Sequence, residues 1–68
     1  MKLLAYEAIL SHPQSLAQVQ QARRSIEAVG GRVVTAPPTR TGMVLVTLLL
    51  PETSFPADFL PTLPFYPV

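Results

Sequence analysis

The strongest structural signal in this chain lies in the stretch LAQVQQARRSIEAVGGRVV, residues 16–34. Apolar residues recur there three or four positions apart, which is the spacing of one face of an α-helix, while glutamines and arginines fill the other positions. Two glycines follow the last apolar residue of this pattern. Glycine readily adopts the left-handed conformation that often follows a helix. The stretch therefore predicts an amphipathic helix that ends at Gly30 and Gly31.

The start of this helix has two alternative caps. Ser11 with Gln14 and Ser15 with Gln18 both have the spacing of a capping box, in which two side chains satisfy free backbone N–H groups. Pro13 is compatible with either, because proline is tolerated in a first helical turn. The sequence leaves both caps open.

Three apolar segments around the helix predict β-strands over residues 2–10, 32–36 and 43–50. The connector over residues 37–42 contains two prolines and a glycine, so the second and third strands should form a hairpin with a loose tip. The resulting order, strand, helix, strand, strand, is the first two thirds of the ferredoxin-like β-α-β-β-α-β pattern.

The last third of the chain is crowded with five prolines over residues 51–68, which excludes a long second helix. We expect one helical turn from Pro56, capped by Thr53 or Ser54, and a short edge strand centred on Phe65 and Tyr66. The predicted fold is α+β, a ferredoxin-like βαββ(αβ) antiparallel sheet with one main helix and a degenerate last αβ unit. Residues 1–68 form a single domain, with a core over 1–50 and a Pro-rich segment over 51–68.

Composition narrows the function classes. The chain has 68 residues, no cysteine, four acidic residues, one histidine and a net charge of +1, so disulfides are excluded and neither a metal nor another cofactor is expected. Its five basic residues are scattered, which argues against nucleic acid. The longest apolar run is far shorter than a membrane helix needs. We expect a cytoplasmic protein whose partner is another protein or a second copy of itself.

Both central strands are apolar on both sides, although one side of such a sheet normally faces water. The side that carries Glu7 and Thr47 is the more polar one, so we assign it to the open face. This prediction makes the following residues a partner-binding face: Leu3, Ala5, Ile9, Met43, Leu45 and Leu49. Such a patch is at the upper limit of what soluble monomers expose. Alternatively, the Pro-rich C-terminal segment folds back over it.

Catalytic residues are hard to assemble from this sequence. His12 has no acidic neighbour in sequence, so it is read as an exposed loop histidine. Glu7 is a single carboxylate on an apolar strand, which is more typical of an ion pair or a sheet rim than of catalysis. Gly30 and Gly31 follow a helix instead of preceding one, so they do not form a phosphate-binding loop. We therefore predict that the protein is not an enzyme.

The sequence SIEAVGGRVV over residues 25–34, with Gly42 before an apolar strand and the LPF sequence at residues 63–65, resembles the propeptide-type inhibitors of subtilisin-like proteases. Members of that family are ferredoxin-like. They dock the open sheet face on two protease helices and place a C-terminal tail in the substrate groove. The resemblance implies docking through Leu3, Ile9, Leu45 and Leu49, and a binding tail that includes Phe65, Tyr66 and Val68.

Three functions follow as hypotheses. The first is a regulatory or assembly module that binds a protein partner or forms a homodimer through the apolar sheet face. The second is a propeptide-like inhibitor or chaperone of a subtilisin-type protease. The third is a small-ligand sensor at a dimer interface.

Overall fold

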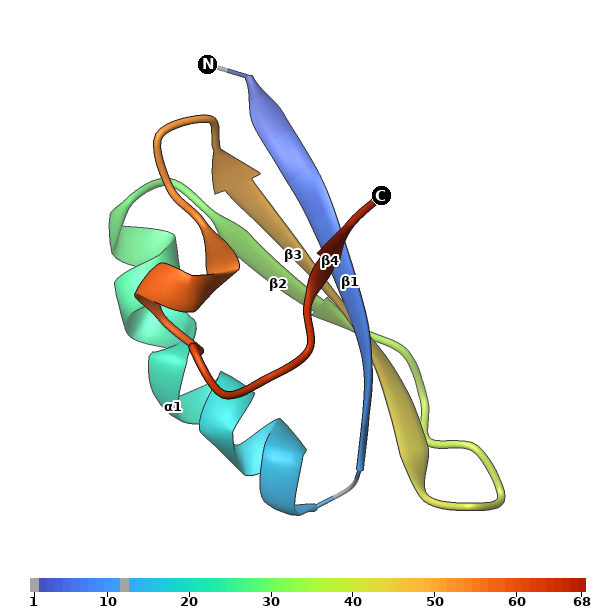
Figure 1. Cartoon of the computed structure of the whole chain (residues 1–68). Coiled ribbons are helices and arrows are strands. Elements are labelled where there is room, and N and C mark those ends of the chain that lie inside the picture. Colours follow the sequence, from blue (N-terminus) through green and yellow to red (C-terminus); the bar gives the residue numbers. More distant parts are fainter. Residues whose placement is uncertain (1, 12) are drawn as a thin grey trace.

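The computed structural model describes residues 2–11 and 13–68 and contains one main helix and a four-stranded antiparallel sheet (Figure 1). Its elements, in chain order, are β1 (Leu3–Ser11), α1 (Gln14–Ala28), β2 (Arg32–Thr35), β3 (Met43–Pro51), the 3-10 turn η1 (Pro56–Asp58) and β4 (Tyr66–Pro67). The strand order is β2-β3-β1-β4, with β1 and β3 in the centre. The predicted α+β, ferredoxin-like arrangement is confirmed.

The two central strands pair along their whole length, from Leu3 opposite Pro51 to Ser11 opposite Met43. Side chains alternate between the two sides of a strand, so every second residue points towards α1. Those residues form the core together with Val19 and Ile26 of the helix and Leu60 of the C-terminal segment, and they are Tyr6, Ala8, Leu10, Val44, Val46, Leu48 and Leu50. The side chosen from the sequence as the helix-covered one is therefore the buried side.

Helix α1 begins with Pro13 at the N-cap position. Within residues 2–11 and 13–68, no side chain accepts a hydrogen bond from the start of this helix. Ser11 still pairs with Met43 in the sheet, so its backbone is extended, while Ser15 lies inside the first helical turn. Both predicted capping boxes are wrong for these reasons. His12, predicted to be an exposed loop residue, lies outside the described residues.

The end of α1 is a Schellman motif, a helix stop in which two backbone bonds close over a left-handed residue. Gly30 has a φ of 89°, its N–H donates to the Glu27 carbonyl over 3.0 Å, and the Gly31 N–H donates to the Ile26 carbonyl over 2.9 Å. The predicted stop at the two glycines is confirmed. It turns the chain sharply enough for Arg32 to enter β2 directly.

After β3 the chain returns to the side of the sheet that α1 covers. The turn η1 begins at Pro56 as predicted, but Phe55 holds the N-cap position in place of Thr53 or Ser54. The Phe55 N–H donates to the Asp58 carboxylate over 2.8 Å, which satisfies a backbone group that the short turn leaves free. The segment then runs beside α1 (Figure 1), where the Thr62 hydroxyl lies 3.4 Å from the Gln18 side-chain oxygen.

Strand β4 pairs with β1 over two residues, Tyr66 opposite Glu7 and Pro67 opposite Tyr6. The next residue, Val68, donates its N–H to the Ala5 carbonyl over 3.0 Å. Hydrogen-bonded and non-hydrogen-bonded pairs alternate along antiparallel strands. Because Val68 is hydrogen-bonded to Ala5, Pro67 occupies a position whose backbone nitrogen faces away from β1, where a proline costs no hydrogen bond of the sheet. The short edge pairing predicted for this segment is present, one residue later than its predicted centre.

Candidate functional site

The side of the sheet opposite α1, here called the open face, is the candidate site. Residues that oppose one another on antiparallel strands place their side chains on the same side of the sheet. The register pairs Ala5 with Leu49 and Ile9 with Leu45, and it places Leu3 and Met43 at opposite ends of the same side. All six residues proposed from the sequence as a partner-binding face therefore lie together on the open face.

Exposed apolar side chains concentrate on this face. Among the described residues, eight large hydrophobic side chains are exposed, and six of them lie on the open face, namely Leu3, Ile9, Val34, Leu45, Tyr66 and Val68. Ile9 leaves 58% of its surface in solvent and Val34 leaves 53%. The other two, Val29 and Phe55, lie at the end of α1 and before η1. Exposed apolar side chains scattered singly over a surface are normal, whereas a cluster on one face is typical of an interaction site.

The C-terminal segment does not cover the open face. Its residues Phe59, Leu63 and Phe65 are half-buried against the core, on the side of α1. Tyr66 and Val68 instead extend the open face, because they stand beside Glu7 and Ala5 as the fourth strand. The three residues predicted as a binding tail are thus divided: Phe65 packs against the core, and the other two lie at the rim of the open face.

Two contributors to the open face were missed in the sequence. Val34 stands opposite Thr47, and Arg32 stands opposite Leu49, both on β2. Their alternation with Val33, which packs against the core, was visible in the sequence. Only the pairing of β2 with β3, however, shows which residues of the open face they lie beside.

The charged residues of the open face are Glu7 on β1 and Arg32 on β2. Glu7 is half-buried between Thr47 and Tyr66, its neighbours across the strands, and Arg32 is exposed beside Leu49. Neither of the two takes part in an ion pair among the described residues, where the only such contact is Arg23 with Glu27 at 3.5 Å. Among the described residues, the open face thus carries one carboxylate and one guanidinium group, and neither is in an ion pair.

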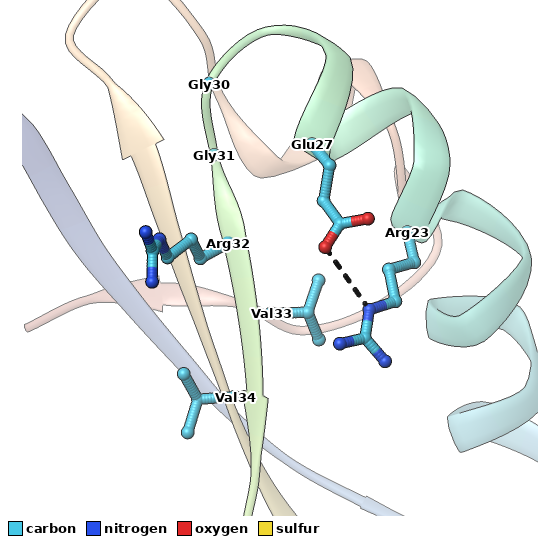
Figure 2. Close-up of a pocket in the computed structure, with 7 residues that line it drawn as sticks. All are labelled: Arg23, Glu27, Gly30, Gly31, Arg32, Val33 and Val34. Atoms are coloured by element: carbon cyan, nitrogen blue, oxygen red, sulfur yellow. Dashed lines mark ion pairs between the residues drawn. The ribbon is translucent and has the colours of Figure 1, made fainter.

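A groove of about 460 Å³ lies between the end of α1 and β2 (Figure 2). It is lined by residues of both elements and of the turn between them, namely Arg23, Glu27, Gly30, Gly31, Arg32, Val33 and Val34. Figure 2 shows that the two arginines do not converge: Arg23 turns to Glu27, whereas Arg32 points to the other side of β2, as Val34 does. The groove therefore does not gather positive charge around an anion.

Acid–base and metal-binding groups are sparse in the described part of the chain, and no three of them come together as a potential metal site. No family model, curated protein or solved structure matches this chain. No helix within residues 2–11 and 13–68 is long and apolar enough to cross a membrane.

Proposed function

We propose that this protein is a small, non-enzymatic interaction module that binds a protein partner through the open face, in a regulatory or assembly role. The observation that carries the proposal is the gathering of six exposed large hydrophobic side chains on the one side of the sheet that α1 leaves uncovered. The C-terminal segment, residues 51–68, does not cover this surface, because Phe59, Leu63 and Phe65 pack against the core on the side of α1.

The energetic argument follows from the area of this surface. An apolar patch of several hundred Å² is at the upper limit of what soluble monomers leave exposed. Covering roughly 400 Å² of such a surface contributes on the order of 10 kcal/mol at about 25 cal/mol per Å², before the entropy lost on association is subtracted. That is enough to drive a specific complex, provided that the partner also matches the polar groups of the face.

Leu45→Glu should weaken any complex made through the open face roughly 100-fold, because it places a charge in the apolar contact. Leu45 is 40% exposed, so the free energy of unfolding of the isolated chain should fall by less than about 1 kcal/mol. Sedimentation velocity and affinity capture from the source organism measure the first effect. Thermal unfolding at low protein concentration measures the second.

Val29→Glu is the matched control for this variant. Val29 is 41% exposed, the substitution changes the net charge equally, and the residue lies at the end of α1, away from the open face. It should leave the complex intact. A complex that survives Leu45→Glu, or one that both variants weaken equally, contradicts the proposal.

Docking on a subtilisin-type protease is a second form of the same proposal. The central position of β1 and β3 and the uncovered face between them match what the resemblance to propeptide-type inhibitors implies. A large excess of the chain should then inhibit such a protease, and Leu45→Glu, but not Val29→Glu, should relieve the inhibition. Protease activity that is unchanged by the excess of chain contradicts this form and leaves the first one standing.

A further inference from the structure

We infer that the partner of the open face is a second copy of this chain, docked face to face around a two-fold axis, with Glu7 of each copy opposite the partner's Arg32. The inference rests on the proposed function, because it takes the open face as the contact surface. It goes further in naming the occupant of that face and the contacts that orient it.

The positions of the two charged residues follow from the strand register. Glu7 stands in the row of Thr47 and Val34, whereas Arg32 stands in the row of Leu49 and Ala5. The two are separated by two strand spacings across the sheet and two residues along it, which is roughly 12 Å between their Cα atoms. Within one copy the two side chains do not form an ion pair with each other.

The midpoint between these residues lies over β3, between Thr47 and Leu49. Because β3 is a central strand, this midpoint is near the middle of the open face. We place a two-fold axis through this midpoint, parallel to the plane of the sheet and perpendicular to the line that joins Glu7 and Arg32. Rotation about this axis puts Glu7 of the second copy over Arg32 of the first, and Arg32 of the second copy over Glu7 of the first. Each glutamate then faces an arginine of the other copy, and both pairs form at once.

The same axis fixes how the two sheets cross. On a flat sheet it sets the strands of the two copies at roughly 70° to each other, near the orthogonal class of sheet packing. The apolar side chains nearest the axis, those of Ala5, Val34 and Leu49, then face the sheet of the other copy.

A wholly apolar partner would be a poor cover for this face. It would bury Glu7 and Arg32 without counter-ions, and a buried charge that loses its partner destabilises a contact by several kcal/mol. A good cover must bring a cation over Glu7 and an anion over Arg32, at the same separation as on this face. A second copy supplies both groups at that separation, because its own Arg32 and Glu7 have the same spacing and lie over Glu7 and Arg32 of the first copy.

The size of the face also suits a dimer. The two central strands are nine residues long. At its widest, the four-stranded sheet therefore measures roughly 20 by 30 Å, given the usual rise and strand spacing. A standard stable interface buries about 800 Å² per partner, so most of the face has to take part. This requirement is met when the axis passes near its centre.

Charge reversal tests the arrangement. Glu7→Arg and Arg32→Glu, each alone, place like charges opposite one another twice in the dimer, and each should raise the dimer dissociation constant roughly 100-fold in sedimentation equilibrium. Mixing the two single variants should give a heterodimer, because all its opposing charges are complementary again. The double variant should self-associate within about tenfold of the unchanged chain.

Two further substitutions serve as charge-matched controls. Arg40→Glu in the loop before β3 and Glu52→Arg after β3 make the same changes of net charge at exposed positions outside the four strands. Neither should change the dissociation constant by more than about twofold, since exposed charges away from a contact are largely screened by salt.

Crosslinking supplies a second measurement that does not depend on the charged variants folding. The chain has no cysteine, so a single introduced thiol reacts without background. Thr47→Cys lies next to the inferred axis and should be crosslinked to its copy by a short bis-maleimide. Thr41→Cys, at the tip of the β2–β3 connection, should not.

The outcomes separate this inference from the proposed function. A chain that stays monomeric up to millimolar concentration and is not crosslinked at Thr47 overturns the second copy as occupant, while the Leu45→Glu test on another partner still decides the proposed function. A dimer that is lost in Leu45→Glu but indifferent to both charge reversals overturns the pairing of Glu7 with Arg32 alone. A dimer that Leu45→Glu leaves intact contradicts both.

Discussion

Leu48→Ala should lower the free energy of unfolding by about 3 to 4 kcal/mol, because it leaves a cavity at the centre of the core. Leu48 is fully buried in the middle of β3, and it stands between Tyr6 on β1 and Val33 on β2. A 68-residue domain has a total stability of roughly 5 kcal/mol, so most of the margin should be lost. Urea unfolding followed by circular dichroism measures the change.

Leu45→Ala is the matched comparison, since it removes the same atoms from the same strand on the opposite side of the sheet. At a protein concentration low enough to keep the chain monomeric, it should lower the free energy of unfolding by less than about 1 kcal/mol. Equal effects of the two variants would mean that both sides of the sheet are buried, which contradicts the assignment of the open face.

The second large effect is expected at Gly31, which lies against both Ile26 of α1 and the backbone of Leu49 in β3. A Cβ atom added there would lie 2.7 Å from the Leu49 carbonyl oxygen, 2.9 Å from Ile26 Cγ2 and 3.0 Å from the Ile26 carbonyl oxygen. Two of these three atoms belong to the backbone, so they move only if the helix and the sheet separate. Gly31→Ala should therefore lower the free energy of unfolding by about 2 to 3 kcal/mol.

Gly30→Asn is the control for this substitution. Gly30 has the left-handed backbone conformation but is exposed, and asparagine is the residue besides glycine that such a helix end accepts. The expected loss is about 1 kcal/mol or less. A larger loss at Gly30 than at Gly31 would show that backbone conformation, and not the close approach to β3, makes the pair of glycines necessary.

Much of this fold could be predicted because its determinants are local in sequence. The apolar spacing from Leu16 to Ile26 sets the buried stripe of α1, and the two glycines stop the helix soon after it. The apolar run from Met43 to Leu50 could form a central strand from its own composition. Glu7 and Thr47 identified the open face correctly, because they oppose each other in the register.

The predictions of the helix cap and of the side covered by the C-terminal segment depended on contacts between residues far apart in the chain. Ser11 has the spacing of a helix cap, but pairing with Met43 keeps it in β1. Phe59, Leu63 and Phe65 are as apolar as the residues of the open face, so composition could not show which side of the sheet they cover. The helix contacts of the C-terminal segment decide it, and they place that segment beside α1.

The candidate site was predictable for β1 and β3, and not for the edge strands. The alternation of the long central strands identifies six members of the face directly. Arg32, Val34 and Tyr66 join the face through the pairing of short strands, and two to four residues do not specify a register by themselves. The charged pattern on which the inferred dimer depends is therefore a property of the fold that residue spacing alone could not show.

The position of β1 in the sheet has a consequence for synthesis on the ribosome. This strand emerges before the rest of the sheet, yet its neighbours on both sides, β3 and β4, come from residues 43–67. The helix and the β2–β3 hairpin can form locally, whereas β1 waits as a nine-residue apolar strand with both edges unpaired. Unpaired apolar edges promote aggregation, so we expect the nascent chain to depend on chaperones more than its small size suggests.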